Sequence, residues 1–474
     1  MNARAFHEPA IQFGNLQMTD TDAAGHTLAL GSTGSGKSLI LRIMMQSVLP
    51  LVGKGLNYSA LVNDAKQDAM PVLAPYCDPS VICLLSPFDE RGYSWNIAKD
   101  CDDSITTNEL CKALIPEKAD SDAFFRYAAR QIIWAVITSF ILSKLDWTLA
   151  DVLRAIRNID ICRRTIIRHL ETSHIVDTYF QNPKLLGDIQ ATLAAHLMDF
   201  DPIAACWEVA HKQGRSVSLT DTMHSERIII LGNIESARGP IDNINRVIFK
   251  RWTDSILSLR DRNGRKFWTF IDELSEAGPL PSIVPFLKKS RSKGGRAVIA
   301  AQSISGLQDS NLYGESVTKD MLSCLSNRFI GRLECPFTAD YVSQYVGDQE
   351  IEQLSSSTTS SSSGRSETTN RNRKIQKAVL PSEVMNVPPC DSEHGLVGLF
   401  KLRSSMVCWD AIDSDVLFNQ LLVPTDDDVP HFIPRDKRSQ YLLPWTKEEE
   451  MRFAPMDDAT PEFRDLSKIH DFTP

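Results

Sequence analysis

The residues with the clearest potential for chemistry lie between His26 and Ile40, in the stretch HTLALGSTGSGKSLI. A short apolar run leads into the pattern G-x-x-x-x-G-K-[ST], and an apolar, helix-like segment follows it. The glycines let the backbone curl so that successive N–H groups point at phosphate oxygens, and the following helix directs its positive end to the same place. Lys37 would reach the β- and γ-phosphates, and the Ser38 hydroxyl would ligate Mg²⁺. The sequence therefore predicts a nucleoside triphosphate site, whose phosphate-binding residues are Gly31, Ser32, Thr33, Gly34, Ser35, Gly36, Lys37 and Ser38.

A second group of candidate residues ends the run KFWTFIDE, at Lys266–Glu273. A strand that ends here would place Asp272 where it can hold the hydrated Mg²⁺, with Glu273 beside it to polarise the attacking water. Many strands end in acids, so the pattern gains its weight from following a phosphate-binding loop in the same chain. Gln302 ends the next apolar run and could sense the γ-phosphate or orient water, although an isolated glutamine at a strand end is more often a capping or turn residue.

The elements that must position these residues alternate between short apolar runs and helical patterns. Apolar runs bounded by turn residues are typical of buried strands, and their alternation with helices favours an α/β fold with a parallel-rich sheet covered on both faces. Two shorter runs around Gly14 are predicted to form a hairpin. The runs predicted to form strands are 11–13, 16–18, 28–30, 60–64, 81–85, 227–233, 266–273, 296–302, 328–334 and 396–402.

The spacing of apolar residues changes between about 119 and 222. Phe124, Ala128, Ile132, Val136 and Phe140 recur at helical spacing, and later segments keep the same period without a strand-like run between them. We interpret this stretch as an inserted all-α domain; the alternative is a helical layer of the main domain. The predicted organisation is a first part of the nucleotide-binding domain over 1–118, the insertion over 119–222, a second part over 223–424 and a C-terminal arm over 425–474.

Composition narrows the class of protein. The chain has 474 residues, 42% hydrophobic and 23% charged, which is ordinary for a globular protein of two units or of one domain with insertions. A net charge of −9 gives no general support for nucleic-acid binding, which would need a local basic surface. Ten cysteines without a CxxC pair indicate reduced thiols. The most apolar run, Ile132–Leu142, is too short to span a bilayer, so we expect a cytoplasmic protein with no direct membrane span.

Two segments stand apart from the predicted core. Within 355–377, the stretch Ser355–Arg373 is low in complexity and polar, and is predicted to be an exposed loop. Its arginines and the lysines just beyond could touch a nucleic acid, and a solvated flexible loop is the alternative; these residues are Arg365, Arg371, Arg373, Lys374 and Lys377. The arm after residue 424 is rich in proline and acids, and we expect Trp445, Phe453 and Phe463 to anchor it to the protein or to a partner.

Together the motifs resemble those of the TraD/TrwB type of conjugative coupling protein, the ATPases of type IV secretion within the FtsK–HerA group of ring translocases. The resemblance extends over roughly residues 10 to 415. Besides the two nucleotide motifs, it rests on several shorter elements of the sequence. These are Asn63-Asp64-Ala65-Lys66, Ser86-Pro87-Phe88-Asp89-Glu90-Arg91 with Trp95-Asn96, Asp122-Ala123-Phe124-Phe125 with Ala129-Arg130, Ile271-Asp272-Glu273-Leu274, and Ser290-Arg291 with Gly294 and Gln302-Ser303.

This resemblance implies a RecA-like P-loop NTPase domain with an inserted all-α domain, ATP and Mg²⁺ as cofactors, and a hexameric ring that binds DNA without reading its sequence. It also implies that each site needs an arginine from the neighbouring subunit. Arg291 falls at the matching position, with Arg328 and Arg332 as fallbacks. The alternative is that Arg291 is a surface residue in the basic run Lys288–Arg296, which would suit a subunit interface or a DNA channel equally well. The implied catalytic residues are thus Lys37, Glu273, Arg291 and Gln302.

Two departures from the family pattern affect these expectations. Most members begin with transmembrane helices, for which the position of the phosphate loop leaves no room here. Either the chain was trimmed, or it is a naturally soluble relative that secretion-channel or relaxosome proteins recruit to the inner membrane. In addition, Asn63–Gln67 lacks the proline and glycine of the family motif, so neither Asp64 nor Lys66 is assigned a role.

The sequence leaves three functions open. The first is an ATP-driven DNA translocase that couples DNA to a secretion channel. The second is an ATPase adaptor that recruits protein substrates without moving DNA, which the acidic C-terminal arm favours. The third is a defence or packaging ATPase on the same ring fold, which would share every site residue.

Overall fold

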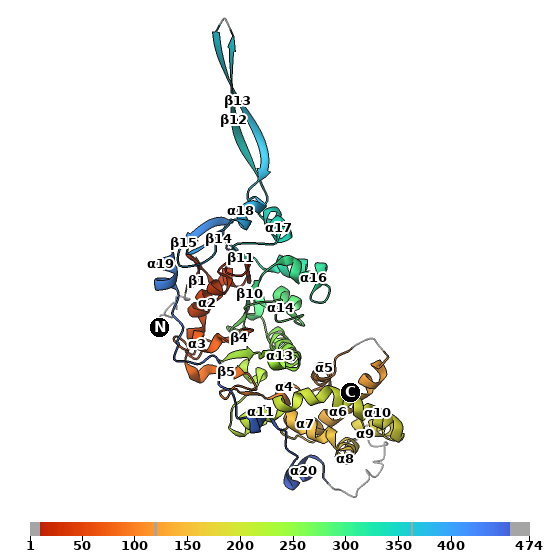
Figure 1. The fold of residues 1–474 in the computed structure, drawn as a ribbon. Coiled ribbons are helices and arrows are strands. Elements are labelled where there is room, and N and C mark those ends of the chain that lie inside the picture. Colours follow the sequence, from red (N-terminus) through yellow and green to blue (C-terminus); the bar gives the residue numbers. More distant parts are fainter. Residues whose placement is uncertain (1–9, 118–120, 362–363, 456–474) are drawn as a thin grey trace, which may run out of the picture. The chain divides into compact units, whose positions relative to one another are not determined.

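The computed structural model describes residues 10–117, 121–361 and 364–455, and the chain divides into two compact units (Figure 1). Unit 1 consists of Met1–Val81 and Ile256–Val429, and unit 2 of Ile82–Ser255 and Pro430–Pro474. Each unit is therefore built from two separate stretches of chain. The segment predicted as an insertion, 119–222, lies wholly within unit 2, but unit 2 begins earlier, extends to Ser255 and also includes the C-terminal arm from Pro430 onward.

Unit 1 is organised around a sheet whose strands run in the order β15-β14-β11-β3-β10-β9-β4. Strands β11, β3, β10, β9 and β4 pair in parallel, whereas β14 and β15 are antiparallel additions at one edge. A separate hairpin joins β1 and β2. The strands of this unit are β1 (Ile11–Phe13), β2 (Leu16–Met18), β3 (Thr27–Leu30), β4 (Tyr58–Asp64), β9 (Lys266–Ile271), β10 (Gly295–Ala301), β11 (Asn327–Ile330), β12 (Asp348–Ser361), β13 (Gly364–Lys377), β14 (Leu396–Lys401) and β15 (Cys408–Ile412).

The helices of unit 1 pack beside the strands of this sheet (Figure 1). Every residue of β3 and of β10 is buried, as expected for parallel strands with both faces covered. The helices and helical turns are α1 (Asp20–Ala23), α2 (Lys37–Val48), η1 (Leu49–Leu51), α3 (Ala69–Leu73), η2 (Pro79–Val81), α14 (Ile283–Lys289), η5 (Arg291–Lys293), α15 (Ile304–Leu307), α16 (Gly314–Cys324), α17 (Pro336–Val346), α18 (Pro381–Met385), α19 (Ser414–Val416) and η6 (Leu417–Leu421).

The predicted fold class is confirmed, and a strand is present at each predicted position, with ends that differ by at most about two residues except in one strand. The strand expected over 328–334 is β11, which ends at Ile330. Beyond it the chain turns away, and Leu333 N–H donates a hydrogen bond to Val384 O in α18. Strand β15 was not predicted because its exposed positions break the apolar pattern of a buried strand.

Unit 2 is mainly helical and contains two pairs of parallel strands, β5 with β8 and β6 with β7. The long helix α6 carries the apolar residues that recur at helical spacing. The elements are β5 (Ile82–Leu85), β6 (Ser94–Trp95), α4 (Ile97–Asp100), α5 (Ser104–Leu114), α6 (Ala123–Leu142), α7 (Leu149–Arg157), α8 (Ile159–Ile167), α9 (Leu170–Tyr179), α10 (Pro183–Leu197), η3 (Met198–Phe200), α11 (Asp201–Lys212), β7 (Ser216–Val217), α12 (Leu219–Thr222), β8 (Ile228–Gly232), η4 (Glu235–Ala237), α13 (Arg238–Ser258), η7 (Lys437–Gln440) and α20 (Lys447–Phe453).

One detail corrects the expectation that 119–222 is entirely helical. The two-residue strand β7 lies inside that range and pairs with β6. A strand this short leaves no period in the sequence, so its partner, more than a hundred residues earlier in the chain, is what defines it.

The low-complexity segment is a second correction. It does not form a loop: β12 and β13 pair over their whole length as an antiparallel ribbon that projects from unit 1 (Figure 1). Acids on β12 oppose bases on β13 near its base. Lys377 lies 2.9 Å from Asp348, and Arg373 lies 3.8 Å from Glu350 and from Glu352. Cross-strand charge pairs of this kind stabilise strands that composition alone assigns to a loop.

The C-terminal arm packs on unit 2 through the two aromatic residues expected to anchor it. Trp445 donates a hydrogen bond to Asp151 (2.8 Å) and stacks on Phe453, with ring centroids 5.0 Å apart. Phe453 in turn packs edge-on against Phe140 of α6, also at 5.0 Å. Phe463 lies outside the described residues.

Phe453→Ala is expected to destabilise unit 2 by about 3–5 kcal/mol, because it leaves a cavity between two aromatic rings. Phe453 is 3% exposed, whereas Met451 on the same helix is 65% exposed. Met451→Ala is therefore the matched control and should have almost no effect. Urea unfolding followed by tryptophan fluorescence measures both changes, and equal midpoints for the two variants would contradict this packing.

Candidate functional site

The predicted phosphate loop connects β3 to α2 in unit 1. Gly34 and Gly36 have φ angles of +74° and +90°, which side chains other than glycine rarely adopt. A Cβ atom at Gly36 would also lie 2.1 Å from Leu396 Cδ1, so a side chain there would displace Leu396 as well as strain the backbone. No side chain caps the N-terminus of α2. The N–H groups of the loop and of the first helical turn are thus arranged to receive an anion.

Segments distant in the sequence hold the loop in place. Ser32 N–H donates to Arg332 O (2.7 Å), and Cys390 N–H donates to Gly34 O (2.8 Å). Lys37 is buried, and its ammonium donates to the carbonyls of Gly31 and Ser32. Burial lowers the pKa of Lys37, while the charge of Glu273 opposes that shift. The lysine is therefore folded against the loop whose phosphate it would bind.

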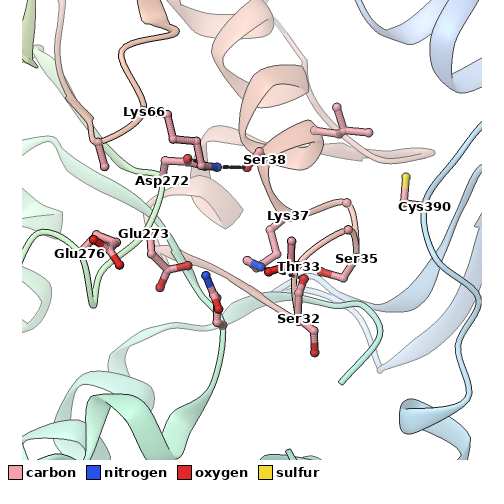
Figure 2. A pocket seen from close by; sticks show the side chains of 15 residues that line it. Ser32, Thr33, Ser35, Lys37, Ser38, Lys66, Asp272, Glu273, Glu276 and Cys390 are labelled. Atoms are coloured by element: carbon pink, nitrogen blue, oxygen red, sulfur yellow. Dashed lines mark hydrogen bonds and ion pairs between the residues drawn. The ribbon is translucent and has the colours of Figure 1, made fainter. Parts of the chain in front are cut away.

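The two predicted metal ligands are in direct contact although 234 positions separate them in sequence. Ser38 Oγ donates to Asp272 Oδ1 at 2.8 Å. A third side chain joins them, because Lys66 Nζ lies 2.6 Å from Asp272 Oδ2 and donates to Ser38 Oγ at 3.0 Å (Figure 2). Burial would lower the pKa of Lys66, but its hydrogen bond to Asp272 and that group's charge keep the pKa above its usual value.

Glu273 lies beside Asp272 at the end of β9 and is buried. Its carboxylate accepts a hydrogen bond from Ser275 Oγ at 2.6 Å, which fixes one oxygen, and the residue lines the pocket. Gln302, just after β10, lines the same pocket. All the residues predicted from the two nucleotide motifs and Gln302 thus meet in one pocket, except that Gly31 forms part of the loop behind it.

The pocket also includes residues that sequence reasoning left without a role. Lys66 and Ala65 follow β4, Glu276 follows the acid pair, and Cys390 arrives from the segment before β14 (Figure 2). Lys66 lies in a motif that resembles the family's, and this was the only signal that could have identified it. The position of Cys390 depends on a backbone contact with Gly34 that no local pattern encodes.

The three arginine candidates differ sharply in their surroundings. Arg328 is buried and its guanidinium donates to Leu322 O and Leu325 O while stacking over Tyr345, which is a structural role. Arg332 is half-buried beside the phosphate loop. Arg291 is exposed and precedes β10, whose seven residues separate it from the pocket edge of the sheet by about 20 Å at the usual rise per residue. Arg291 is therefore too distant to reach its own pocket.

Acids neutralise much of the basic run around Arg291. Lys288 pairs with Asp320 (2.8 Å), and Arg296 pairs with Asp20 (2.7 Å). Lys293 lies 3.4 Å from Asp261. Within the described part of the chain, Lys289 and Arg291 form no ion pair. Arg291 is thus an exposed guanidinium available to a second molecule.

The motif Ser86–Arg91 lies in unit 2, where its hydrogen bonds stabilise the local structure. Asp89 holds Arg91 through two hydrogen bonds of 2.7 and 2.9 Å. Arg435 of the C-terminal arm is buried and donates to Pro87 O and Gly92 O at 2.8 and 2.9 Å. This motif therefore fastens the arm to unit 2, which no sequence pattern indicated.

Two patterns are relevant to the described residues: a cluster of metal-binding side chains and a membrane-spanning helix. No group of three or more histidine, cysteine, aspartate or glutamate side chains among them is arranged to hold a metal ion. Ser38 and Asp272 nevertheless offer the oxygen donors that Mg²⁺ prefers when phosphates and water complete its shell. Over the described ranges, no helix combines the length and the apolar character needed to cross a membrane.

Comparison with known proteins identifies what this architecture resembles. The model of the type IV secretion-system coupling protein DNA-binding domain matches residues 10–401. Coupling protein TraD of Escherichia coli (strain K12) is 22% identical over 350 residues, which are 72% of this chain but 46% of TraD. The chain thus spans about half the length of that relative.

Solved structures of TrwB share the fold. The unbound bacterial conjugative coupling protein TrwB, without its first 70 residues, superposes with a TM-score of 0.64 at 17% identity, covering 90% of this chain and 92% of that one. The plasmid coupling protein TrwB in complex with ADP and Mg²⁺ gives a TM-score of 0.62 at 17% identity, covering 90% and 93%. A complex of TrwB with a non-hydrolysable ATP analogue gives 0.61 at 18% identity, covering 90% and 92%.

Proposed function

Because the chain belongs to the type IV secretion-system coupling proteins, we propose that it is an ATPase that binds DNA in a hexameric ring and feeds DNA, or a nucleoprotein substrate, to a secretion channel. The observation that carries the proposal is the single pocket that brings Lys37, Ser38, Asp272, Glu273 and Gln302 together. TrwB binding ADP with Mg²⁺ and an ATP analogue supports ATP and Mg²⁺ as the ligands here.

We assign each pocket residue a task that its position in the pocket supports. The loop N–H groups and Lys37 hold the phosphates, and Lys37 must exchange its carbonyl partners for phosphate oxygens when ATP binds. Ser38 and Asp272 would hold Mg²⁺, which would supply positive charge to offset that of the nucleotide phosphates. Glu273, oriented by Ser275, accepts the proton of the attacking water, and Gln302 orients that water or senses the γ-phosphate.

The site needs a cation from outside its own subunit. Charge develops on the γ-phosphate during transfer, and an arginine supplied in trans stabilises it. Arg291 is exposed, unpaired with any acid among the described residues and remote from its own pocket. We therefore assign Arg291 to the site of the neighbouring copy, which makes the hexamer a condition for turnover. Because Arg328 is buried and bonded, it is not retained as a candidate.

DNA is bound through its backbone, because no residue pattern in the chain is suited to base readout. The other partners are secretion-channel or relaxosome proteins, which would recruit the protein from the cytoplasm to the inner membrane. The adaptor alternative drew support from the acidic arm, but part of that charge is neutralised within unit 2. Arg164 lies 2.6 Å from Glu450, and Lys212 lies 3.8 Å from Glu449.

The test is the steady-state ATPase rate with and without single- or double-stranded DNA, with assembly followed by light scattering. We expect the rate per subunit to rise steeply with protein concentration and with DNA, and DNA stimulation to weaken between about 50 and about 200 mM salt because phosphate contacts release counterions. Lys37→Ala, which removes the phosphate-binding ammonium, is the negative control. An ATPase indifferent to both DNA types at every salt concentration would overturn the DNA-translocase function and favour the adaptor.

A further inference from the structure

Lys66 lines the pocket but belongs neither to the phosphate loop at 31–38 nor to the acid pair at 272–273. Its ammonium contacts both side chains that are suited to hold the divalent cation, at 2.6 Å from Asp272 Oδ2 and 3.0 Å from Ser38 Oγ (Figure 2). Lys37, the lysine of the phosphate loop, is directed at the carbonyls of Gly31 and Ser32 instead. Lys66 is therefore the counter-ion of Asp272, while Lys37 is committed to the loop.

The local fold directs Lys66 toward the pocket. Strand β4 ends at Asp64, which is buried and accepts hydrogen bonds from the N–H groups of Asp68 and Ala69, each at 3.1 Å. Gln67, which lies between Asp64 and Asp68, has a φ of +59°, a conformation that costs energy for a residue with a side chain. Asp64 thus closes a tight turn of which Lys66 is the tip, and this turn presents the ammonium to Asp272.

An ammonium and a divalent cation cannot share these oxygens. The lone pairs of Ser38 Oγ and Asp272 that bind Lys66 are the ones that a Mg²⁺ ion must use, and two cations at such short distances repel each other. We propose that Lys66 competes with Mg²⁺ for Ser38 and Asp272, and thereby sets the Mg²⁺ concentration at which the nucleotide site fills.

This role makes Lys66 a positioning residue. Without the metal, its charge offsets that of Asp272 in a pocket that also contains Glu273 and Glu276, and its two contacts keep Ser38 and Asp272 in place. A metal ion at these oxygens would require the Lys66 ammonium to leave them, and its half-exposed side chain has room to turn toward solvent. The inference rests on the proposed function, since it requires that the pocket bind Mg²⁺ with a nucleotide.

The test is equilibrium binding of a fluorescent ADP analogue to the full chain, titrated with MgCl₂ and repeated in EDTA. Lys66→Met removes the competing charge at similar size, so the Mg²⁺ concentration for half-maximal binding should fall about 3- to 5-fold, the effect of losing one partly exposed ion pair. Lys66→Arg keeps the charge and should resemble the wild type. Lys54→Met, on an exposed turn of the same unit, is the matched control.

The outcomes separate the inference from the function on which it rests. If Lys66 only stabilises the fold, Lys66→Met will lower the unfolding midpoint and leave the Mg²⁺ dependence of ADP binding unchanged, which overturns the inference alone. An increased Mg²⁺ requirement in Lys66→Met would overturn it too, because it would mean that the lysine assists metal binding. A wild-type protein that binds no nucleotide at any Mg²⁺ concentration overturns the proposed function and this inference with it.

Discussion

Arg291→Ala is expected to leave ATP binding unchanged and to lower kcat by about 10³-fold or more, the usual effect of losing an arginine that stabilises the transferring phosphate. Binding is preserved because Arg291 precedes β10, whereas the pocket lies at the other end of that strand, where Gln302 follows it. The measurements are binding of a fluorescent ATP analogue and steady-state hydrolysis at protein concentrations where the ring is assembled. Lys289→Ala is the matched control, since Lys289 is an exposed cation two residues away.

A mixing experiment separates a trans role from a structural one. Arg291→Ala and Lys37→Ala should each be inactive alone. In mixed rings, an Arg291→Ala subunit keeps an intact pocket and receives Arg291 from a Lys37→Ala neighbour, so activity should reappear. Mixing that restores nothing, in rings shown by light scattering to contain both variants, would remove Arg291 from the site of its neighbour.

Glu273→Gln should bind ATP as tightly as the wild type and hydrolyse it about 10²- to 10⁴-fold more slowly, because the amide cannot accept the proton of the attacking water. Ser275 Oγ can still donate to the remaining carbonyl oxygen, so the geometry at the end of β9 should persist. Single-turnover hydrolysis measures the chemical step directly and excludes product release as the cause.

Glu276→Gln is the matched control for this variant. Glu276 lines the same pocket and carries the same charge, but it is exposed to solvent. We expect less than about a 10-fold change in the hydrolysis rate when it is replaced, since it is exposed to solvent and does not belong to the acid pair that follows β9. If Glu273→Gln turned over normally and Glu276→Gln did not, the general base would be Glu276, and the role assigned to Glu273 would be wrong.

The nucleotide pocket could be anticipated from the sequence because its parts are local patterns. Residues 31–38 require a fixed spacing of glycine, lysine and serine, and the acid pair at 272–273 ends an apolar strand. Parallel strands have their carboxyl ends at one edge of a sheet, so two motifs that each follow a strand are expected to meet there. The contact between Ser38 and Asp272 has this origin.

The ribbon of β12 and β13 shows where local pattern is insufficient. The stretch Ser355–Arg373 has the composition of a solvated loop, and the antiparallel register decides otherwise by setting Asp348 opposite Lys377 and Glu352 opposite Arg373. Pairing across a hairpin depends on which residues face each other rather than on how many of each type are present. The C-terminal arm is similar, because its acidic, proline-containing sequence gives no sign that Arg435 will be buried against Pro87 and Gly92.

The amino-acid sequence thus predicted the chemistry that we propose for this protein: phosphate binding by a glycine loop, metal binding by a hydroxyl and a carboxylate, and general-base catalysis by a second acid. Such patterns span a few residues, and their meaning depends on neighbours in the chain. The folded chain added the relationships among distant segments. It placed Arg291 away from its own pocket, enclosed Arg328 within the core, and brought Lys66 into contact with Asp272, because those positions follow from strand order and packing that no short stretch encodes.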